Sequence, residues 1–344
     1  MSNLGVAPLP ALLGKFFFWM TKPFHFLKDN PVLYRGRHFN IVFFGVFAAL
    51  EAMSILLAFV FYLGLRGAVL APVAVPEFLL LVVFVWIGAR LFHLFALGKK
   101  FLAQPRKYLL QTGFYVQGGL VGLLVWCFQA APVLQISIFT LMDGLLWAGA
   151  LGQFWGRLGC FNYGCCFGKP THQDCGVSYH NEESKVLRWR PDLKGKPLHP
   201  TQLYTAYANL FVFIVFLFLL PLNLPTGFIS MSLLAAHGLL RIFIETLRED
   251  IYFHGKRNGS TLRFALASLV AAGLLGFVGH LVDPFFLESI PFRLSPSWSH
   301  LFVIVGSRLY LEIAILGAGL VAFLGYGIHG KTLGQFPVPV QLEN

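Results

Sequence analysis

Residues 210–220 read Leu-Phe-Val-Phe-Ile-Val-Phe-Leu-Phe-Leu-Leu, an apolar run with no polar interruption. A second run of the same kind occupies residues 79–86. The strands of a transmembrane β-barrel alternate polar and apolar residues in segments of ~10 residues, so continuous runs favour helices. A helix that crosses the hydrocarbon core needs ~20 mostly apolar residues. These two stretches therefore predict transmembrane helices.

The composition of the whole chain agrees with this prediction. Of the 344 residues, 57% are hydrophobic and 12% are charged, and the mean hydropathy is +0.70. A soluble domain carries ~25% charged residues, so a soluble protein this apolar could not cover its core. The net charge is +11, but the basic residues are scattered among the apolar segments. We assign them to contacts with anionic lipid headgroups and expect no nucleic-acid partner.

Apolar length and flanking residues define the candidate spans. They cover approximately residues 40–64, 79–97, 113–130, 134–156, 202–221, 226–246, 262–281 and 301–326. We predict an all-α, polytopic transmembrane helix bundle of about seven to eight spans, with a polar loop (157–201) between spans four and five. Residues 1–39 are predicted to be an interfacial aromatic and basic segment, with a helix over 11–34. Residues 40–281 form the transmembrane domain, and 282–344 a C-terminal extension with one extra span.

Several ionisable residues lie inside or beside these spans. They are Glu51, Arg90, Asp143, Arg157, Arg241, Glu245 and Arg248. Charges in a bilayer are costly, so each is a functional candidate. Arg241 and Glu245 stand four residues apart and share a helix face with Arg248, an arrangement that suits a lipid phosphate. The alternatives are an ion pair that joins two helices, and arginines that reach from span ends to the interface.

Three polar motifs flank the spans. Gly156-Arg-Leu-Gly-Cys-Phe-Asn-Tyr-Gly-Cys-Cys-Phe-Gly168 ends the fourth span, and its glycines allow tight turns and close approach of a ligand. His199-Pro-Thr-Gln-Leu-Tyr204 opens the fifth span, and Gly113-Phe-Tyr-Val-Gln-Gly-Gly-Leu120 opens the third.

Together these motifs resemble those of the prolipoprotein diacylglyceryl transferase family over about residues 40–280. The matching positions are Arg157, Gly159, Phe161, Gly164 and Gly168 in the signature, His199, Pro200, Gln202, Leu203 and Tyr204 in the second motif, Arg241, Glu245 and Arg248 on a later helix, and also Asp143 and Arg90. The resemblance implies a membrane enzyme of the bacterial inner membrane. Such an enzyme moves a diacylglyceryl group from phosphatidylglycerol to a cysteine thiol of a lipobox-containing preprotein and releases glycerol phosphate.

The resemblance also implies site residues. The implied catalytic residues are Arg157, Arg241, Glu245, His199 and Tyr204. The implied substrate-binding residues are Arg90, Gln117, Gly118, Gly119, Asp143, Cys160, Gly164, Cys165, Gly168, Gln202 and Arg248. We expect Arg157 and Arg241 to hold the phosphate, and no metal or cofactor to be required.

The sequence departs from the family pattern at positions expected to carry chemistry. Gln117 replaces a histidine, Cys160 and Tyr163 replace asparagines, and Cys165 and Thr205 replace glutamates. Two hypotheses follow: a transferase that keeps or changes its lipid donor and acceptor, and a relative that binds a phospholipid without turning it over.

The cysteines support a third hypothesis, a membrane thiol or metal protein. Cys160, Cys165, Cys166 and Cys175 lie close in sequence to His172, His180 and His199. A metal site, a disulfide or redox pair, a nucleophile that forms a covalent lipid intermediate, and apolar packing all remain open. The spacing lacks the two Cys-x-x-Cys-like pairs of a structural zinc site.

The orientation of the polar loop has two conflicting indications. Basic residues precede the first span and follow the second and sixth, which places these loops and residues 157–201 in the cytoplasm. The resemblance places the signature loop on the opposite side, and we adopt that orientation for the site.

Overall fold

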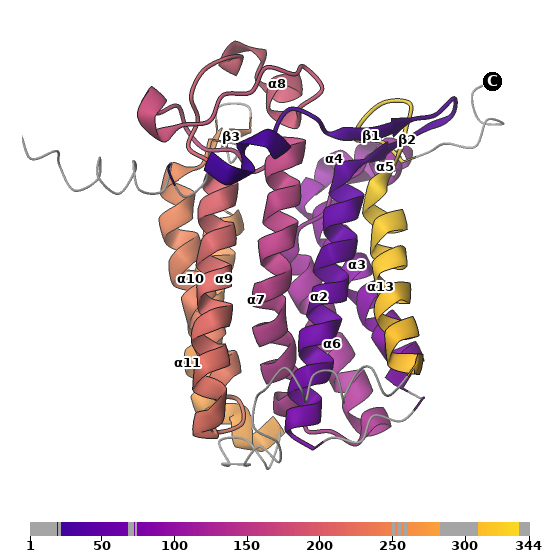
Figure 1. Ribbon diagram of the computed structural model, residues 1–344, viewed down its shortest axis with the longest axis vertical. Coiled ribbons are helices and arrows are strands. Elements are labelled where there is room, and N and C mark those ends of the chain that lie inside the picture. The colour runs from indigo at the N-terminus through magenta and orange to yellow at the C-terminus, as the bar shows by residue number, and fades with distance from the viewer. Residues whose placement is uncertain are drawn as a thin grey trace, which may run out of the picture.

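The computed structural model describes residues 19, 22–67, 72, 74–249, 252–253, 256–257, 260–282 and 309–336. Long helices run side by side through this part of the chain, with a polar cap at one end (Figure 1). The long helices are α2 (Phe43–Leu65), α3 (Ala74–Leu97), α6 (Val116–Leu134), α7 (Ile138–Tyr163), α9 (Thr201–Leu219), α10 (Phe228–Leu247), α11 (Ser260–Val282) and α13 (Leu309–Gly327). Among the described residues, six helices (all of these except α7 and α11) are long and apolar enough to cross a membrane. The prediction of an all-α membrane bundle is confirmed.

The shorter elements lie mostly at the capped end. They are η1 (Lys22–Leu27), β1 (Val32–Arg35), β2 (Phe39–Val42), α4 (Lys99–Ala103), α5 (Pro105–Leu110), η2 (Gln173–Cys175), α8 (Lys185–Trp189), η3 (Pro191–Leu193), η4 (Leu220–Leu222), β3 (Tyr252–Phe253), β4 (Lys256–Arg257) and β5 (Ile328–Gly330). Strand β2 lies between β1 and β5 in an antiparallel sheet, with Phe39 opposite Gly330.

The expected N-terminal helix over residues 11–34 is much shorter in the described part of the chain. Residues 11–18, 20 and 21 lie outside the described residues; of the others in this range, Trp19 is helical and the six-residue η1 covers 22–27. Pro31 biases the preceding residue toward extended backbone. Residues 32–35 then pair with β2 as a strand instead of continuing a helix.

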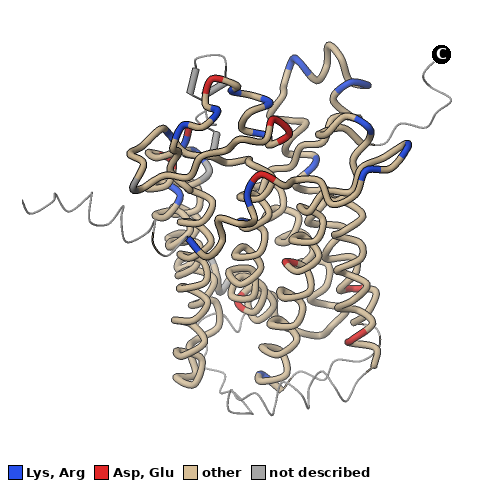
Figure 2. Tube along the Cα trace, turned by 45° about the horizontal axis from the view of Figure 1, so that its top comes forward, with Lys and Arg blue, Asp and Glu red and all other residues tan. Residues whose placement is uncertain are grey.

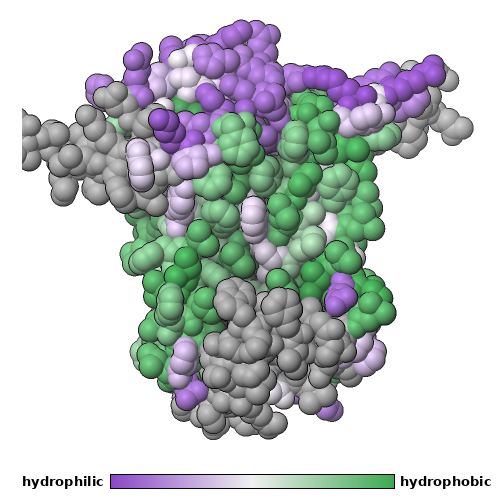
Figure 3. Space-filling view, viewed as in Figure 1, coloured by the Kyte–Doolittle hydropathy of each residue, from purple (hydrophilic) through white to green (hydrophobic). Residues whose placement is uncertain are grey.

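The surface of the bundle is that of a protein in lipid. On the face shown in Figure 3, hydrophobic side chains cover the helices below the hydrophilic cap. Phe277, Phe95 and Phe218 are 86%, 80% and 76% exposed. Leaving such rings in water costs about 25 cal/mol per Å² of apolar surface, so these side chains belong in hydrocarbon. The chain is therefore a multi-pass membrane protein.

The signature motif extends its helix further than predicted. Helix α7 ends at Tyr163 rather than near residue 156, because two signature glycines are packing positions rather than turns. A Cβ on Gly156 would lie 2.4 Å from Glu51 Oε2, and one on Gly159 would lie 2.9 Å from Phe47 Cβ. The expected turn occurs at Gly164, whose φ of +76° ends the helix. Helix α7 can therefore approach α2 closely.

The polar loop folds into a cap with a small apolar core of its own. This core consists of Phe167, Tyr179, Val186, Leu187, Leu193 and Leu198. The carboxylate of Asp29 accepts hydrogen bonds from the backbone N–H of His180 (3.0 Å) and Asn181 (3.2 Å), which ties the cap to the N-terminal segment. Most of the described Lys and Arg residues lie at this end of the Cα trace (Figure 2).

Helix α13, which the sequence predicts as an extra span, is part of the same bundle. It packs against α2 and α3. Two glycines allow the contact with α2, since a Cβ on Gly45 would lie 2.4 Å from the Cα of Gly327. The strand β5 that follows then pairs with β2, so the C-terminal end of α13 is fixed.

Candidate functional site

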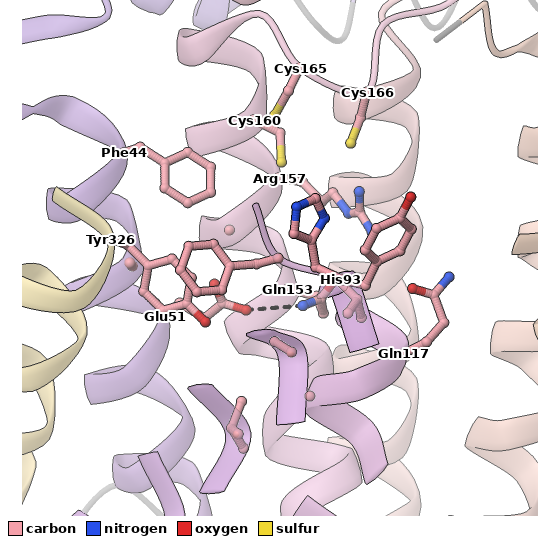
Figure 4. Close-up of a pocket in the computed structure, with 18 of the residues that line it drawn as sticks. Phe44, Glu51, His93, Gln117, Gln153, Arg157, Cys160, Cys165, Cys166 and Tyr326 are labelled. Atoms are coloured by element: carbon pink, nitrogen blue, oxygen red, sulfur yellow. Dashed lines mark hydrogen bonds between the residues drawn. The ribbon is translucent and has the colours of Figure 1, made fainter. Parts of the chain in front are cut away.

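A large cavity opens between the long helices beneath the polar cap. Its volume is about 1290 Å³, and α2, α3, α6, α7, α10 and α13 all contribute to its walls. Apolar side chains such as Leu145, Leu146 and Leu233 line one part, while arginines, cysteines and a carboxylate line another (Figure 4). Such a cavity can hold a molecule with acyl chains and a charged headgroup.

Three of the predicted arginines line this cavity: Arg157 on α7, Arg241 on α10 and Arg248 just beyond α10. Each of these arginines is at most 9% exposed, and all three lie within electrostatic range of one another. The Nε atoms of Arg157 and Arg241 are buried and have no hydrogen-bond partner among the described residues. Buried donors that lack a partner cost about 1–3 kcal/mol each, so this end of the cavity is built for an anion.

The backbone around Arg248 explains how it reaches the cavity. Residues 167–169 and 247–249 pair across the cap: Lys169 N–H donates to Leu247 O (2.8 Å) and Glu249 N–H to Phe167 O (3.2 Å). This pairing places Arg248 opposite Gly168. A Cβ on Gly168 would lie 2.5 Å from the carbonyl oxygen of His199, so a larger residue could not pack there.

Glu245 forms an ion pair with Arg241. Its Oε2 lies 3.3 Å from Arg241 Nη2, and its carboxylate is buried. Glu245 does not line the cavity itself. The sequence prediction that the two share a helix face is confirmed, and that Glu245 orients the Arg241 guanidinium stays a prediction.

A buried carboxylate that the predicted site omits also faces the cavity. Glu51 on α2 accepts a hydrogen bond from Gln153 Nε2 at its Oε1 (2.9 Å), and Arg157 lies within electrostatic range. Figure 4 shows Glu51 on the same wall as Tyr326. An acidic residue inside a span was the sequence signal for this position. Its partners could not be predicted from the sequence, because they belong to α7 and α13.

Three cysteines converge at the charged end of the cavity. The Sγ atoms of Cys160, Cys165 and Cys166 all lie within 4.8 Å of one another. Hydrogen bonds from the thiols of Cys160 and Cys165, with Arg248 and Arg157 nearby, hold the pKa of Cys166 well below its ordinary value. Cys165 has its pKa raised to about 12. Cys160 and Cys165 were among the predicted site residues, whereas Cys166 was named only in the motif and in the thiol or metal hypothesis.

Of the three predicted site residues in the glycine-rich motif, Gln117 and Gly119 line the cavity. Gly118 instead faces α3, where a Cβ would lie 2.2 Å from the carbonyl oxygen of Gly88. Its role in this structure is therefore close packing of α6 on α3.

Arg90 lies outside the cavity lining and forms hydrogen bonds with the segment that precedes α6. Its guanidinium donates to the carbonyl oxygens of Tyr108 (2.7 Å), Leu109 (2.9 Å) and Gly113 (3.0 Å). These contacts fix the entry to α6, which carries Gln117.

Asp143 lies on α7 away from the cavity lining. Its Oδ2 accepts from Gly227 N–H (2.7 Å), and its Oδ1 accepts from the N–H (2.8 Å) and hydroxyl of Ser230. The carboxylate thus caps the first turn of α10.

The second motif supports the signature from outside the cavity lining. His199 Nδ1 lies 3.4 Å from the Tyr204 hydroxyl, and burial, with Lys169 nearby, lowers the pKa of His199. Gln202 Nε2 donates to the carbonyl oxygen of Cys165 (2.8 Å). Gly164 ends α7 immediately before the cysteine pair. The proposed roles of His199 and Tyr204 in catalysis stay predictions.

Several other residues line the cavity although no sequence pattern had marked them as site residues. They are His93, Lys185, Arg188, His237, Tyr326 and His329. Tyr326 and His329 belong to the region after residue 282, where the motifs offered no guidance.

Comparison with known proteins identifies the family to which this chain is similar. A sequence model described as prolipoprotein diacylglyceryl transferase matches residues 31–282. A phosphatidylglycerol–prolipoprotein diacylglyceryl transferase of Clostridium tetani is 29% identical over 144 residues, 41% of this chain and 54% of the relative. The protein of that name from Finegoldia magna is 26% identical over 47% of this chain and 60% of its own length. The one from Lysinibacillus sphaericus is 24% identical over 72% of this chain and 92% of its own length.

The first two of these alignments span little more than half of each relative, while the family match covers the bundle from β1 to α11. Both the signature and the arginine helix fall inside the matched residues. Helix α13, which contributes Tyr326 to the cavity, falls outside them. The chain belongs to the prolipoprotein diacylglyceryl transferase family.

Proposed function

We propose that this protein transfers the diacylglyceryl group of phosphatidylglycerol to a cysteine thiol of a prolipoprotein in the bacterial inner membrane. One observation carries the proposal: Arg157, Arg241 and Arg248 face one cavity that also has an apolar wall. Phosphatidylglycerol combines acyl chains with an anionic phosphate, so its two halves match the two kinds of wall. The printed names of the relatives support the same donor and acceptor.

The arginines would act on the phosphate leaving group. The thiolate sulfur attacks the diacylglyceryl carbon bonded to a phosphate oxygen. The new S–C bond forms while that C–O bond breaks, and its electron pair leaves with glycerol phosphate. Negative charge develops on the phosphate, where preorganised guanidinium donors stabilise the transition state.

Glu51 is our candidate for the acceptor of the thiol proton. It is the carboxylate that lines the cavity in the described part of the chain, and Gln153 and Arg157 fix its environment. A carboxylate can act as a general base when it can reach the proton it removes. Gln117, which replaces a family histidine, lines the same cavity but cannot take a proton near neutral pH.

The test is transfer by the purified full-length chain in lipid nanodiscs. Phosphatidylglycerol labelled in its acyl chains is supplied with a lipobox peptide, and we expect label on the peptide and free glycerol phosphate. Arg157→Ala and Arg241→Ala should abolish transfer. Arg263→Ala removes an exposed arginine on α11 and serves as the matched control. Folded protein that transfers no label to the peptide contradicts the proposal.

A second function, retention of a phospholipid without turnover, is favoured by Gln117 at the position of the family histidine. Native mass spectrometry distinguishes the two. Retention predicts bound phosphatidylglycerol that is lost in Arg241→Ala and that no acceptor consumes, whereas transfer predicts glycerol phosphate as a product.

A further inference from the structure

The cysteine cluster at the charged end of the cavity has a geometry that packing alone does not require. Cys160 lies in the last turn of α7, while Cys165 and Cys166 follow the helix. All three line the cavity, and Figure 4 shows their sulfurs gathered above Arg157. Cys175, in the same cap, is not part of the cluster.

The backbone is specifically bent to bring these thiols together. Gly164 has φ +76°, and Cys166 has φ +57°, which is uncommon for a residue with a side chain and costs about 1–3 kcal/mol. Helix α9 stabilises this shape from its first turn. Thr201 Oγ1 donates to the carbonyl oxygen of Cys166 (2.7 Å), and Gln202 Nε2 to that of Cys165 (2.8 Å). Adjacent residues thus present their sulfurs to one point.

We propose that Cys160, Cys165 and Cys166 bind a thiophilic divalent cation of the Zn²⁺ type, with a fourth coordination position open to the cavity. Zn–S bonds of ~2.3 Å in tetrahedral geometry place ligand sulfurs ~3.8 Å apart. The three Sγ atoms, already within 4.8 Å of one another, would move by about 1 Å or less. Three protein ligands with an open position are typical of catalytic zinc rather than structural zinc.

The surrounding charges suit thiolate ligands. Three thiolates and a divalent cation carry one net negative charge. Arg157 and Arg248 lie within electrostatic range of Cys166, and Lys185 within range of Cys165. These cations balance the excess negative charge, while the backbone bonds from Thr201 and Gln202 orient the ligands.

The use of the open position rests on the proposed function. An acceptor thiol that binds there would lose its proton on coordination, because metal-bound thiols are deprotonated. Its sulfur would then face a phosphate held by Arg157 and Arg241. The proton leaves toward Glu51 or solvent, and the S–C and C–O bond changes are those given above. This assignment accounts for a transfer site in which Gln117 replaces a histidine base.

The experiment measures Zn²⁺ directly in the full-length protein, purified without oxygen and exposed to Zn²⁺ alone. We expect about one Zn²⁺ per chain by elemental analysis, and thiolate-to-metal charge-transfer absorption after Co²⁺ substitution. Cys160→Ser, Cys165→Ser and Cys166→Ser should each weaken Zn²⁺ binding more than about 100-fold. Thr201→Val, which removes a supporting hydrogen bond, should weaken it about 10–100-fold.

Cys175→Ser and Cys127→Ser are the matched controls, because these free cysteines lie outside the cluster. Both should keep the metal and the charge-transfer absorption. The proposal is overturned by less than a tenth of an equivalent of Zn²⁺ in folded wild-type protein, by equal loss in the control variants, or by a Cys165–Cys166 disulfide in the anaerobic protein. Transfer by folded protein that binds no added Zn²⁺ refutes the metal site alone, whereas bound Zn²⁺ without transfer refutes the proposed function alone.

Discussion

Two sets of buried charged residues, one near each end of the bundle, differ in how completely the fold satisfies their hydrogen bonds. At the end opposite the cap, Arg66 donates to the Tyr62 hydroxyl (3.2 Å) and to Leu224 O (3.2 Å), and Asp143 caps α10 with both oxygens occupied. Beneath the cap, Arg157 and Arg241 keep buried Nε donors that have no partner among the described residues. Within a membrane, charge that is satisfied by the fold is structural, whereas charge that the fold leaves unsatisfied is available to a ligand.

Removing Arg157 is the most direct test of this difference between structural charge and charge available to a ligand. Arg157→Ala should lower turnover about 100-fold or more, because it removes a donor aimed at the developing phosphate charge. The unfolding midpoint should change little, since this side chain has an unused donor in the fold. Rates from the labelled-lipid assay, set beside unfolding in mixed micelles, separate the two effects. A large loss of stability in Arg157→Ala would mean that the guanidinium is structural.

Asp143→Ala should behave in the opposite way. It leaves the N–H of Gly227 and both donors of Ser230 without a partner, so we expect about 3 kcal/mol of destabilisation. Turnover per folded molecule should stay within about threefold of wild type. Asp143→Asn keeps one acceptor and should cost less. If Asp143→Ala folds normally but stops transfer, the division between the two ends is wrong.

Gly156→Ala tests the packing that sets the position of Glu51. The new Cβ would lie 2.4 Å from Glu51 Oε2, so the carboxylate must shift, and we expect about a tenfold loss of turnover. In Gly156→Ala/Glu51→Ala the two losses should not add, because both act on the same carboxylate. Gly273→Ala is the control, since a Cβ there meets nothing within 4 Å. Additive losses would assign Gly156 another role.

The smallest effect is expected at His199. Its ring lies outside the cavity lining and pairs with Tyr204, so His199→Ala should lower turnover less than about fivefold. A loss near that of Arg157→Ala in the same assay would instead assign His199 to the chemistry, as the family resemblance implies.

Apolar length and charged residues within spans were enough to predict the helices and the arginine set. Each predicted span overlaps a helix in the described residues, and Arg157, Arg241 and Arg248 do share one cavity. The information was local: hydrophobic runs and helical spacing.

The rest depended on contacts between distant segments. Gly156 reads as a turn residue in isolation, and only the approach of α2 makes it a packing position. The convergence of the three cysteines requires the positive φ of Cys166, which its sequence neighbours do not specify. Tyr326 reaches the cavity because β5 pairs with β2, a contact between residues nearly 300 positions apart along the chain.

That pairing sets the order in which the protein can mature during synthesis. Helices insert into the membrane as the ribosome delivers them, and the arginine-bearing α10 arrives well before α13. Until α13 docks, the side that Tyr326 and His329 will close stays open to surrounding lipid. A nascent chain halted after α11 would therefore contain Arg157, Arg241 and Arg248 but lack an enclosed site. The walls of the cavity are therefore complete only when α13, which follows the other long helices of the described residues, is in place.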